Sequence, residues 1–380
     1  MRDFELEVYF SKWEFAAEHH MTASDAESLT LTELRDKASP EDRAAFENLR
    51  LGYTDTQGGL YVREAIATTY SDLQPEHIQC FAGAEEGVYI AMKVLLDAAD
   101  HAIVVVPNYQ AAETIPLSIC GVSGVPLLED ENWRLDLVAV KAAIRPSTKL
   151  ISINFPNNPT GAVPDRDTFE NLLELCREHD LYLFSDEVYR LLEVDEAKRL
   201  PQVADVYAKG LSLNVMSKAY GLPGLRIGWI ANRDMELLAR FNRYKHYLSI
   251  CNSAPSEHLA VIALKAREQI LERNRSIVRE NISRLNDFFA DYPQLFEWTP
   301  PDGGCVAFPR YIGSGDVTAF CKRLVEEAGV LLLPGSIYRS ELMETPPDRF
   351  RIGCGRRNIE TGLAAFREFL DRNLDALSQV

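Results

Sequence analysis

Four short apolar runs, separated by longer stretches of mixed polarity, constrain the fold of this chain most strongly. They cover residues 102–107, 150–155, 181–185 and 211–216. Uncharged runs of this length are typical of strands buried on both faces of a parallel sheet. Residues 165–178, between two of the runs, have the periodicity of an amphipathic helix, with an apolar face made of Phe169, Leu172, Leu173 and Cys176. This rhythm predicts an α/β fold with a mostly parallel, doubly wound sheet flanked by helices.

A smaller α+β domain is predicted after this sheet. Its elements are a strand over 304–311, a helix over 317–328, strands over 330–333 and 350–353, and a last helix. Asn358 is placed to cap that helix, whose inner face carries Ile359, Leu363, Phe366 and Leu370.

Four segments follow from this pattern. Residues 1–50 are expected to join the small domain, and residues 51–255 to form the large domain. Residues 256–290 read as one long connecting helix, and residues 291–380 as the small C-terminal domain.

Composition excludes several classes of protein. The chain has 380 residues, 26% of them charged, and a net charge of −17. An acidic balance disfavours nucleic acid and anionic membranes as partners. Every apolar run is too short to span a bilayer, and the N-terminus lacks the pattern of a secretory signal. The seven cysteines form no close pair and no zinc-binding spacing, so we expect a cytoplasmic protein without a metal site.

Two cations follow the last of the four apolar runs. Lys218 comes directly after it, and Arg226 follows eight residues later, beyond a turn rich in Gly and Pro. Ligands of doubly wound sheets bind outside the carboxyl ends of the strands. Desolvation there lowers the pKa of a lysine and makes its amine nucleophilic, while a guanidinium matches a phosphate. A purely structural role explains two such cations poorly.

Other polar residues also stand at predicted strand ends. Asp186 and Tyr189 follow the run 181–185, and Asn158 lies in an Asn- and Pro-rich turn after 150–155. A carboxylate leaving a buried strand needs a cation nearby. Tyr109 follows the run 102–107 and either stacks on a planar ligand or only packs.

Two further features suggest anion binding. Gly83, Ala84 and Glu85 precede a helical run and suit a phosphate, although an ordinary helix start explains them as well. Arg351 stands in the apolar strand 350–353, where a buried guanidinium needs a carboxylate from the protein or from a substrate.

In this order and spacing, Asn158, Asp186, Tyr189, Lys218, Arg226 and Arg351 give the chain its resemblance to the class I/II aminotransferases. These are pyridoxal-phosphate (PLP) enzymes of fold type I. The resemblance spans residues 53–351 and rests on the combination of NNPTG, DEVY and SKAYGLPGLRIGW.

The resemblance implies a role for each matching residue. Lys218 would form the Schiff base with PLP and later move the proton, and Asp186 would pair with the ring nitrogen. Asn158 and Tyr189 would bind the phenolic oxygen, and Tyr109 would stack on the ring. The phosphate would lie against Gly83, Ala84, Glu85, Ser217, Arg226 and, from the neighbouring subunit of a homodimer, Tyr53. Arg351 would clamp the α-carboxylate of an amino acid or 2-oxo acid, with Asn158 as a second substrate contact and Tyr247 either lining the substrate pocket or packing in the interface.

Two positions depart from the pattern of the family. Val215 stands where a Ser or Thr usually donates to the phosphate, which shifts that task to Arg226, Tyr53, Ser217 or the helix N-terminus. Glu85 is unusual beside a phosphate, so its side chain is expected to point away.

Amino transfer between an L-amino acid and a 2-oxo acid is the predicted reaction. The alternative is PLP-dependent elimination, β-replacement or cyclisation, because the same fold hosts all of these. If Asp25 or Glu27 faces the pocket, a cationic substrate follows, as in capreomycidine-synthase-type enzymes. A transcription regulator built on this fold is disfavoured by the acidic charge and by the lack of a spare basic domain.

Overall fold

A mixed sheet of eight strands forms the centre of the larger part of the molecule. The computed structural model describes residues 1–378. The strand order is β2 (Ile78–Phe81), β9 (Gly228–Ala231), β8 (Gly210–Val215), β7 (Tyr182–Asp186), β6 (Thr148–Asn154), β3 (His101–Val106), β4 (Gly121–Leu128) and β5 (Arg134–Leu135). The five strands from β8 to β4 run parallel to one another, whereas β9 and β5 run antiparallel to their neighbours. The predicted α/β fold with its mostly parallel sheet is confirmed.

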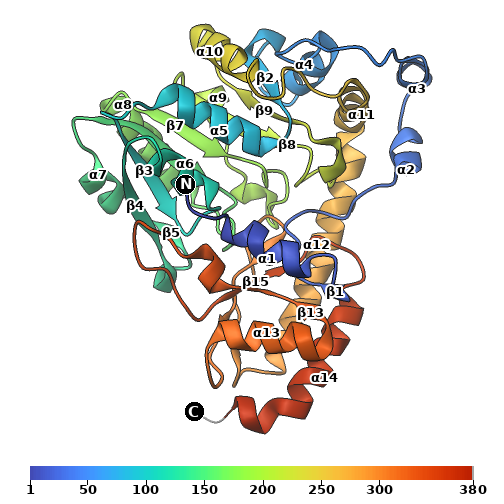
Figure 1. The fold of residues 1–380 in the computed structure, drawn as a ribbon, viewed down its shortest axis with the longest axis vertical. Helices are drawn as coiled ribbons and strands as arrows, with labels where there is room; N and C mark the ends of the chain where they lie inside the picture. Colours follow the sequence, from blue (N-terminus) through green and yellow to red (C-terminus); the bar gives the residue numbers. More distant parts are fainter. Residues whose placement is uncertain (379–380) are drawn as a thin grey trace.

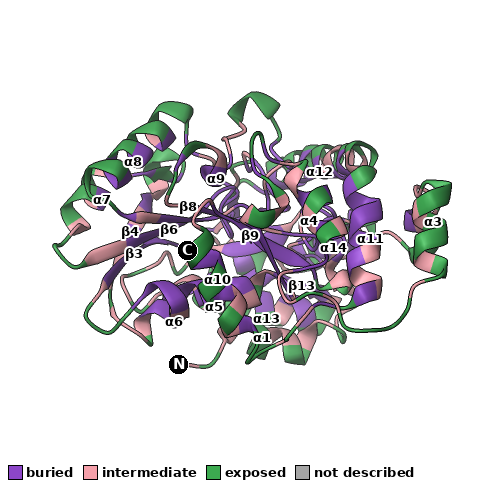
Figure 2. Cartoon of the chain, turned by 90° about the horizontal axis from the view of Figure 1, so that it is seen from above, coloured by how far each residue is buried: buried purple, intermediate pink, exposed green. Residues whose placement is uncertain are grey.

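Helices cover both faces of this sheet (Figure 2). One layer contains α5 (Ala84–Leu95), α6 (Ala111–Leu117) and α10 (Met235–Lys245), and the other contains α7 (Leu137–Ala143), α8 (Arg166–Glu178) and α9 (Val203–Val206). The two layers exclude water from both faces, which is why β3 is buried along its whole length. The apolar face predicted for 165–178 is the buried face of α8, and Asp165 caps that helix by accepting from the amide of Thr168.

The smaller domain combines both ends of the chain (Figure 1). Near the N-terminus, β1 (His19–His20) pairs with β13 (Val330–Leu331). Two antiparallel sheets complete the strands: β11 (Val306–Ala307), β15 (Phe350–Gly353) and β14 (Leu333–Pro334) form one, and β10 (Phe296–Glu297) and β12 (Arg310–Tyr311) form the other. The helices α13 (Val317–Ala328) and α14 (Ile359–Leu377) cover them.

Several predicted elements of this part differ in detail. The strands predicted over 304–311 and 330–333 are each split in two, because their halves pair with different partners. Asn358 does stand at the start of α14, but its backbone is left-handed, with φ of 61°, and its side chain makes no capping hydrogen bond.

The helix predicted over 256–290 is two helices, α11 (Ala254–Lys265) and α12 (Arg267–Ala290). The chain leaves helical geometry at Ala266, with φ of −93° and ψ of 14°. α11 packs on α4 (Leu60–Ala67) of the larger part, whereas α12 packs on α14. Because the chain turns at Ala266, the consecutive helices α11 and α12 can pack on α4 and on α14 respectively.

The N-terminal segment crosses from one domain to the other. α1 (Glu5–Trp13) lies at the junction of the domains, and α2 (Leu31–Arg35) and α3 (Pro40–Glu47) lead to α4 along the outside of the molecule (Figure 1). In the part of the chain that the structure describes, no helix is long and apolar enough to cross a bilayer.

Candidate active site

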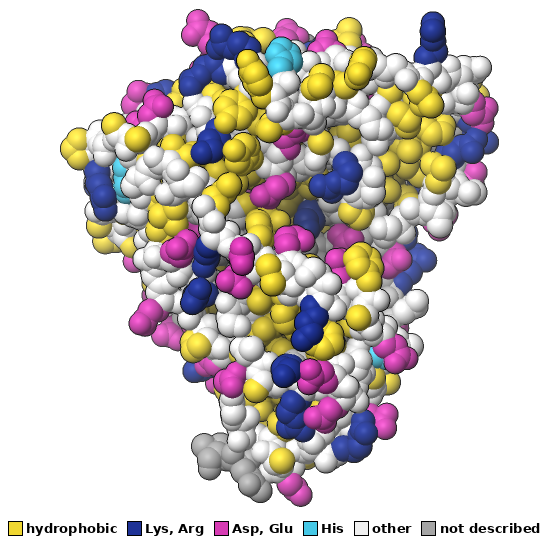
Figure 3. Space-filling view, viewed as in Figure 1, with side chains coloured by type: hydrophobic (Ala, Val, Ile, Leu, Met, Phe, Trp, Pro, Cys, Tyr) yellow, Lys and Arg dark blue, Asp and Glu magenta, His cyan; other side chains and the backbone are white. Residues whose placement is uncertain are grey.

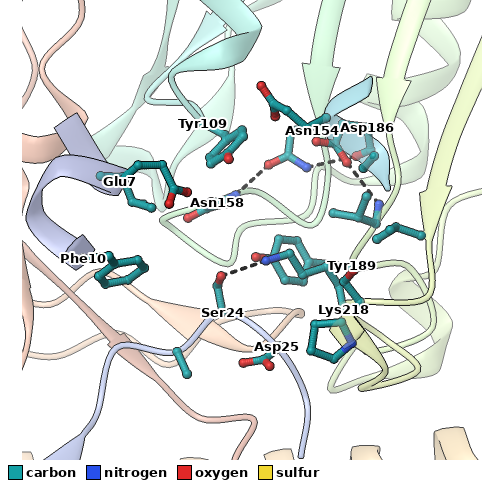
Figure 4. A pocket seen from close by; sticks show the side chains of 18 of the residues that line it. Glu7, Phe10, Ser24, Asp25, Tyr109, Asn154, Asn158, Asp186, Tyr189 and Lys218 are labelled. Atoms are coloured by element: carbon teal, nitrogen blue, oxygen red, sulfur yellow. Dashed lines mark hydrogen bonds between the residues drawn. The ribbon is translucent and has the colours of Figure 1, made fainter. Parts of the chain in front are cut away.

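A cavity of about 390 Å³ lies between the carboxyl ends of the central strands, the small domain and the N-terminal segment (Figure 4). Ten residues that the sequence singles out line it: Ala84, Glu85, Tyr109, Asn158, Asp186, Tyr189, Ser217, Lys218, Arg226 and Arg351. Gly83 directly precedes the first of them. Residues that are up to 267 positions apart in sequence, from 84 to 351, therefore meet in one place.

Tyr53 and Tyr247 do not line this cavity. Their side chains are 92% and 88% exposed. The segments that carry them lie close together, since Thr54 donates to the carbonyl of Asn252. The two tyrosines therefore lie on an exposed surface outside the cavity.

Lys218 follows β8 and reaches into the cavity. Its Nζ donates to Ser24 Oγ at 2.9 Å and lies 5.8 Å from the centre of the Tyr189 ring (Figure 4). Burial lowers the pKa of this amine below its usual value. A lysine in these surroundings holds a larger fraction of the nucleophilic neutral form at neutral pH.

Asp186 ends β7 and lies across the cavity. Its carboxylate accepts from the amide of Val188 at 3.2 Å, and its carbonyl accepts from the Asn154 side chain at 3.0 Å. Burial raises the pKa of Asp186 to about 6. Among the described residues no Lys or Arg forms an ion pair with it, so a cation supplied by a ligand would stabilise the ionised form.

A cradle for an anion is formed where α5 begins. Gly83 has φ of 94°, and a Cβ at this position would lie 2.5 Å from Nη2 of Arg226. No side chain caps the helix here, so its first amides remain available. Within residues 1–378 Arg226 has no carboxylate partner; its side chain donates only to the carbonyl of Pro223. Ser217 and Val215 line the same cavity.

The Glu85 side chain does not turn away from the cavity, contrary to the expectation. It lines the wall near Asp186, and burial together with the charge of Asp186 raises its pKa to about 7. Partial protonation at neutral pH reduces its repulsion of a nearby anion.

Arg351 lies on β15 and is 1% exposed. Its guanidinium donates to Tyr338 Oη at 2.7 Å, to the carbonyl of Thr22 at 2.7 Å and to Asn158 Oδ1 at 3.4 Å. None of the described Asp or Glu side chains forms an ion pair with it. The expected need of this buried cation for a carboxylate is thus not met by the residues that the structure describes.

Sequence reasoning missed several lining residues. Ser24, which accepts from Lys218 Nζ, carries no local signal, because only the tertiary fold brings it here. The same holds for Tyr338, which does not line the cavity but donates to Asn158 Oδ1 at 2.9 Å. The helix α1 contributes Leu6, Glu7 and Phe10, and His20 and Arg356 complete the outer wall.

The conditional expectation about Asp25 and Glu27 is met only in part. Asp25 lines the cavity, but Arg356 binds both of its carboxylate oxygens, at 3.0 and 3.1 Å. Glu27 accepts from the backbone amide of Arg357 and does not line the cavity. Neither carboxylate is therefore free to bind a cationic substrate.

Comparison with known proteins identifies the class. Residues 22–365 match the family described as aminotransferase class I and II, and the chain belongs to this family of PLP-dependent enzymes. The resemblance predicted from the motifs is confirmed, as is the cofactor.

Three similar proteins illustrate the range of the family. The capreomycidine synthase of Streptomyces vinaceus is 29% identical over 370 residues, covering 96% of this chain and 93% of that protein. The arginine–pyruvate transaminase of Pseudomonas aeruginosa is 31% identical over 322 residues, covering 80% of this chain and 79% of that protein. The structure of a PLP-dependent aminotransferase from Streptococcus suis matches with a TM-score of 0.91 and 32% identity, covering 98% of both chains.

Proposed function

We propose that this enzyme transfers the α-amino group of an L-amino acid to a 2-oxo acid. One observation carries the proposal: Lys218, Asp186 and Arg351 line a single cavity, and Arg351 has no carboxylate partner among the described residues. When bound, PLP supplies an electron sink for negative charge at the substrate Cα.

The cavity fits PLP at two places that can be checked. The glycine-lined cradle at the start of α5 leaves room for a phosphate beside Arg226, where any Cβ would collide with the guanidinium. The hydroxyl of Tyr189 is buried and has no hydrogen-bond partner in the described chain, which suits an oxygen of a bound ring. Asn158, Tyr109, Ser217 and the amides of Ala84 and Glu85 would complete the binding site.

Lys218, Asp186 and Arg351 would each have a different role in the reaction. Lys218 would hold the cofactor covalently and, once released, would move a proton as a neutral amine, which its lowered pKa favours. Asp186 would keep a ring nitrogen protonated through its negative charge. Arg351 would bind the α-carboxylate in a bidentate manner and so fix the orientation of the bonds at Cα.

A homodimer is part of the proposal. The exposed Tyr53 and Tyr247 lie on neighbouring segments, and Leu51, Leu248 and Ile250 are exposed near them in sequence. Hydrophobic side chains also gather at the upper right of Figure 3, over the region of α2, α3 and α11. Burial of such a surface against a second copy would bring Tyr53 to the phosphate of the neighbouring site.

A second reaction remains a candidate because of one relative. The capreomycidine synthase matches nearly the whole length of the chain. Cyclisation or elimination would use the same Lys218, Asp186 and Arg351, so the geometry alone supports both fates of the substrate.

The dependence on an acceptor separates the two reactions. The PLP-loaded enzyme is incubated with a panel of L-amino acids, each with and without a 2-oxo acid, and the products are followed by mass spectrometry. Amino transfer predicts continuous turnover only when the oxo acid is present. Continuous product formation without any oxo acid would contradict amino transfer and favour the cyclase or lyase.

A further inference from the structure

The outer wall of the active-site cavity is formed by α1, which is tied to both domains. On the side of the large domain, Arg2 pairs with Glu113 at 3.1 Å, and the amide of Glu5 donates to Gln110 Oε1 at 3.0 Å. On the side of the small domain, Tyr9 Oη donates to the carbonyl of Leu332 at 3.1 Å. The helix is therefore held in place over the cavity, and its side chains have a defined position relative to Arg351.

Two carboxylates from this segment face the cavity. Glu7 lies on α1, Glu14 is its C-terminal capping residue, and both line the wall (Figure 4 shows Glu7). Within residues 1–378 Glu7 forms no ion pair. Among the described residues, Glu14 forms an ion pair only with His20, at 4.0 Å. Burial together with Arg356 lowers the pKa of His20 to about 4, so this imidazole is neutral at pH 7.

The other charges of the cavity are already matched. Asp25 is paired with Arg356. Under the proposed function, Lys218 and Arg226 bind the cofactor, Asp186 binds its ring nitrogen, and Arg351 binds the α-carboxylate of the substrate. Glu85, with its pKa near 7, carries only part of a charge. Among the described residues, Glu7 and Glu14 are then the two remaining carboxylates of the cavity wall, and neither forms an ion pair with a Lys or Arg.

Glu7 also acts on other ionisable groups of the cavity wall. Burial is the main cause that raises the pKa of Glu14, of Glu85 and of Tyr109, and the negative charge of Glu7 adds to each of these shifts. Phe10 lies between the two acids in the sequence of α1, and its ring also faces the cavity. An aromatic face beside carboxylates is a favourable site for a planar cation.

We infer that Glu7 and Glu14, with Phe10 between them, bind a positively charged side chain of the amino-acid substrate. This inference rests on the proposed function, since it needs Arg351, whose guanidinium carbon lies 5.9 Å from the centre of the Phe10 ring, to hold the α-carboxylate. A guanidinium group matches the site best, because it pairs with carboxylates through two parallel hydrogen bonds and stacks on an aromatic ring. Acidic amino acids such as aspartate are disfavoured by the same two charges.

Binding without chemistry tests this inference. The PLP-loaded enzyme is titrated calorimetrically with 5-guanidinopentanoate, which is arginine without its α-amino group, and with the neutral 5-ureidopentanoate of the same length. Because neither ligand has an α-amine, neither can react with the cofactor. We expect the guanidino compound to bind at least about tenfold more tightly, as for hydrogen bonds to charged groups.

Variants locate the effect on α1. Glu7→Gln and Glu14→Gln are each expected to lower the affinity for the guanidino compound about tenfold. The affinity for the ureido compound should fall less than about threefold in the same variants. Glu5→Gln, which removes the same charge from the same helix but does not line the cavity, is expected to change neither. Thermal unfolding of each variant checks that the fold is retained.

The outcomes separate this inference from the proposed function. Equal affinities of the wild type for the two ligands, or equal losses for both ligands in Glu7→Gln and Glu14→Gln, would overturn the inference while leaving amino transfer intact. Failure of the protein to bind PLP would overturn the proposed function first. The inference is supported if both variants lose affinity for the guanidino compound selectively and Glu5→Gln keeps the wild-type affinity.

Discussion

Two lysines, Lys245 and the half-buried Lys218, show why position decides reactivity in this chain. Lys245 is fully buried, and burial lowers its pKa as it does that of Lys218. Lys245 Nζ, however, donates to two backbone carbonyls and to Asn252 Oδ1, and it does not line the cavity. Lys218 has a single hydroxyl partner and faces open space. Of these two lysines, only Lys218 is free to react with a ligand in the cavity.

The ionised carboxylate of Asp186 is expected to lower the free energy of unfolding of the cofactor-free protein above neutral pH. Its pKa of about 6 in the folded chain exceeds that of an unfolded aspartate, so the folded state binds the proton more tightly. Stability is therefore lost as the pH rises through about 6, and the loss reaches about 3 kcal/mol at pH 8. Asp186→Asn should make the cofactor-free protein more stable than the wild type by up to this amount at pH 8, and by about half of it at pH 5.

Urea unfolding at the two pH values measures this difference. Asp287→Asn, an exposed position on α12, serves as the control and should show no such dependence. A wild type that is as stable as Asp186→Asn at pH 8 would show that the carboxylate is not strained in the empty site.

At the level of elements, the N-terminus of α5 is expected to determine cofactor affinity. In Gly83→Ala, the new Cβ would lie 2.5 Å from Arg226 Nη2 at a backbone φ of 94°, so the guanidinium must move. We expect PLP to bind at least about tenfold more weakly, as when a hydrogen bond to a charged group is lost. Fluorescence titration with PLP measures the dissociation constant.

Gly224→Ala is the matched control for that change. Gly224 lies close to Arg226 in sequence, but a Cβ there meets no atom within 4 Å. Unchanged affinity in Gly83→Ala would mean that the phosphate lies elsewhere, whereas reduced affinity in Gly224→Ala would mean that the loop as a whole is sensitive.

The elements also show how far sequence reasoning reaches. Four strands of the large sheet, β3, β6, β7 and β8, were predictable because a strand covered on both faces is largely apolar, as β3 is. In the small domain the strand 350–353 was predicted correctly, but the split of 304–311 was not, because residues 306–307 pair with β15 whereas residues 310–311 pair with β10. Partner exchange of this kind depends on tertiary packing and leaves no periodic signal.

The residues of the candidate site were likewise predictable only where a local sequence pattern marks them. Asn158, Asp186 and Lys218 were predictable because each follows an apolar strand, where sheets of this kind bind ligands. Glu7 and Phe10 reach the cavity from the N-terminal helix, and Tyr338 of the small domain contacts its wall by donating to Asn158. Their contribution depends on how the domains meet, and no local pattern marks it.

At the level of the whole molecule, the active site is expected to be shared between two chains. If Tyr53 serves the neighbouring site, Lys218→Ala and Tyr53→Ala damage different sites of a mixed dimer. One site of each mixed dimer then contains both native residues. Random mixing of the two inactive variants should restore about a quarter of the wild-type activity, because half of the dimers are mixed.

Activity is measured after the two variants are mixed under conditions that exchange subunits, and sedimentation confirms the mass of a dimer. Each variant incubated alone is the control. A mixture that contains mixed dimers but stays inactive would contradict a role of Tyr53 across the interface.

The central claim is that Lys218 carries the cofactor. Reduction of the PLP-loaded enzyme with borohydride, followed by peptide mass spectrometry, tests it directly, since the reduction makes the bond between lysine and cofactor permanent. We predict one modified lysine, at position 218, and no modification at Lys245. Modification of another lysine, or of none, would contradict the account.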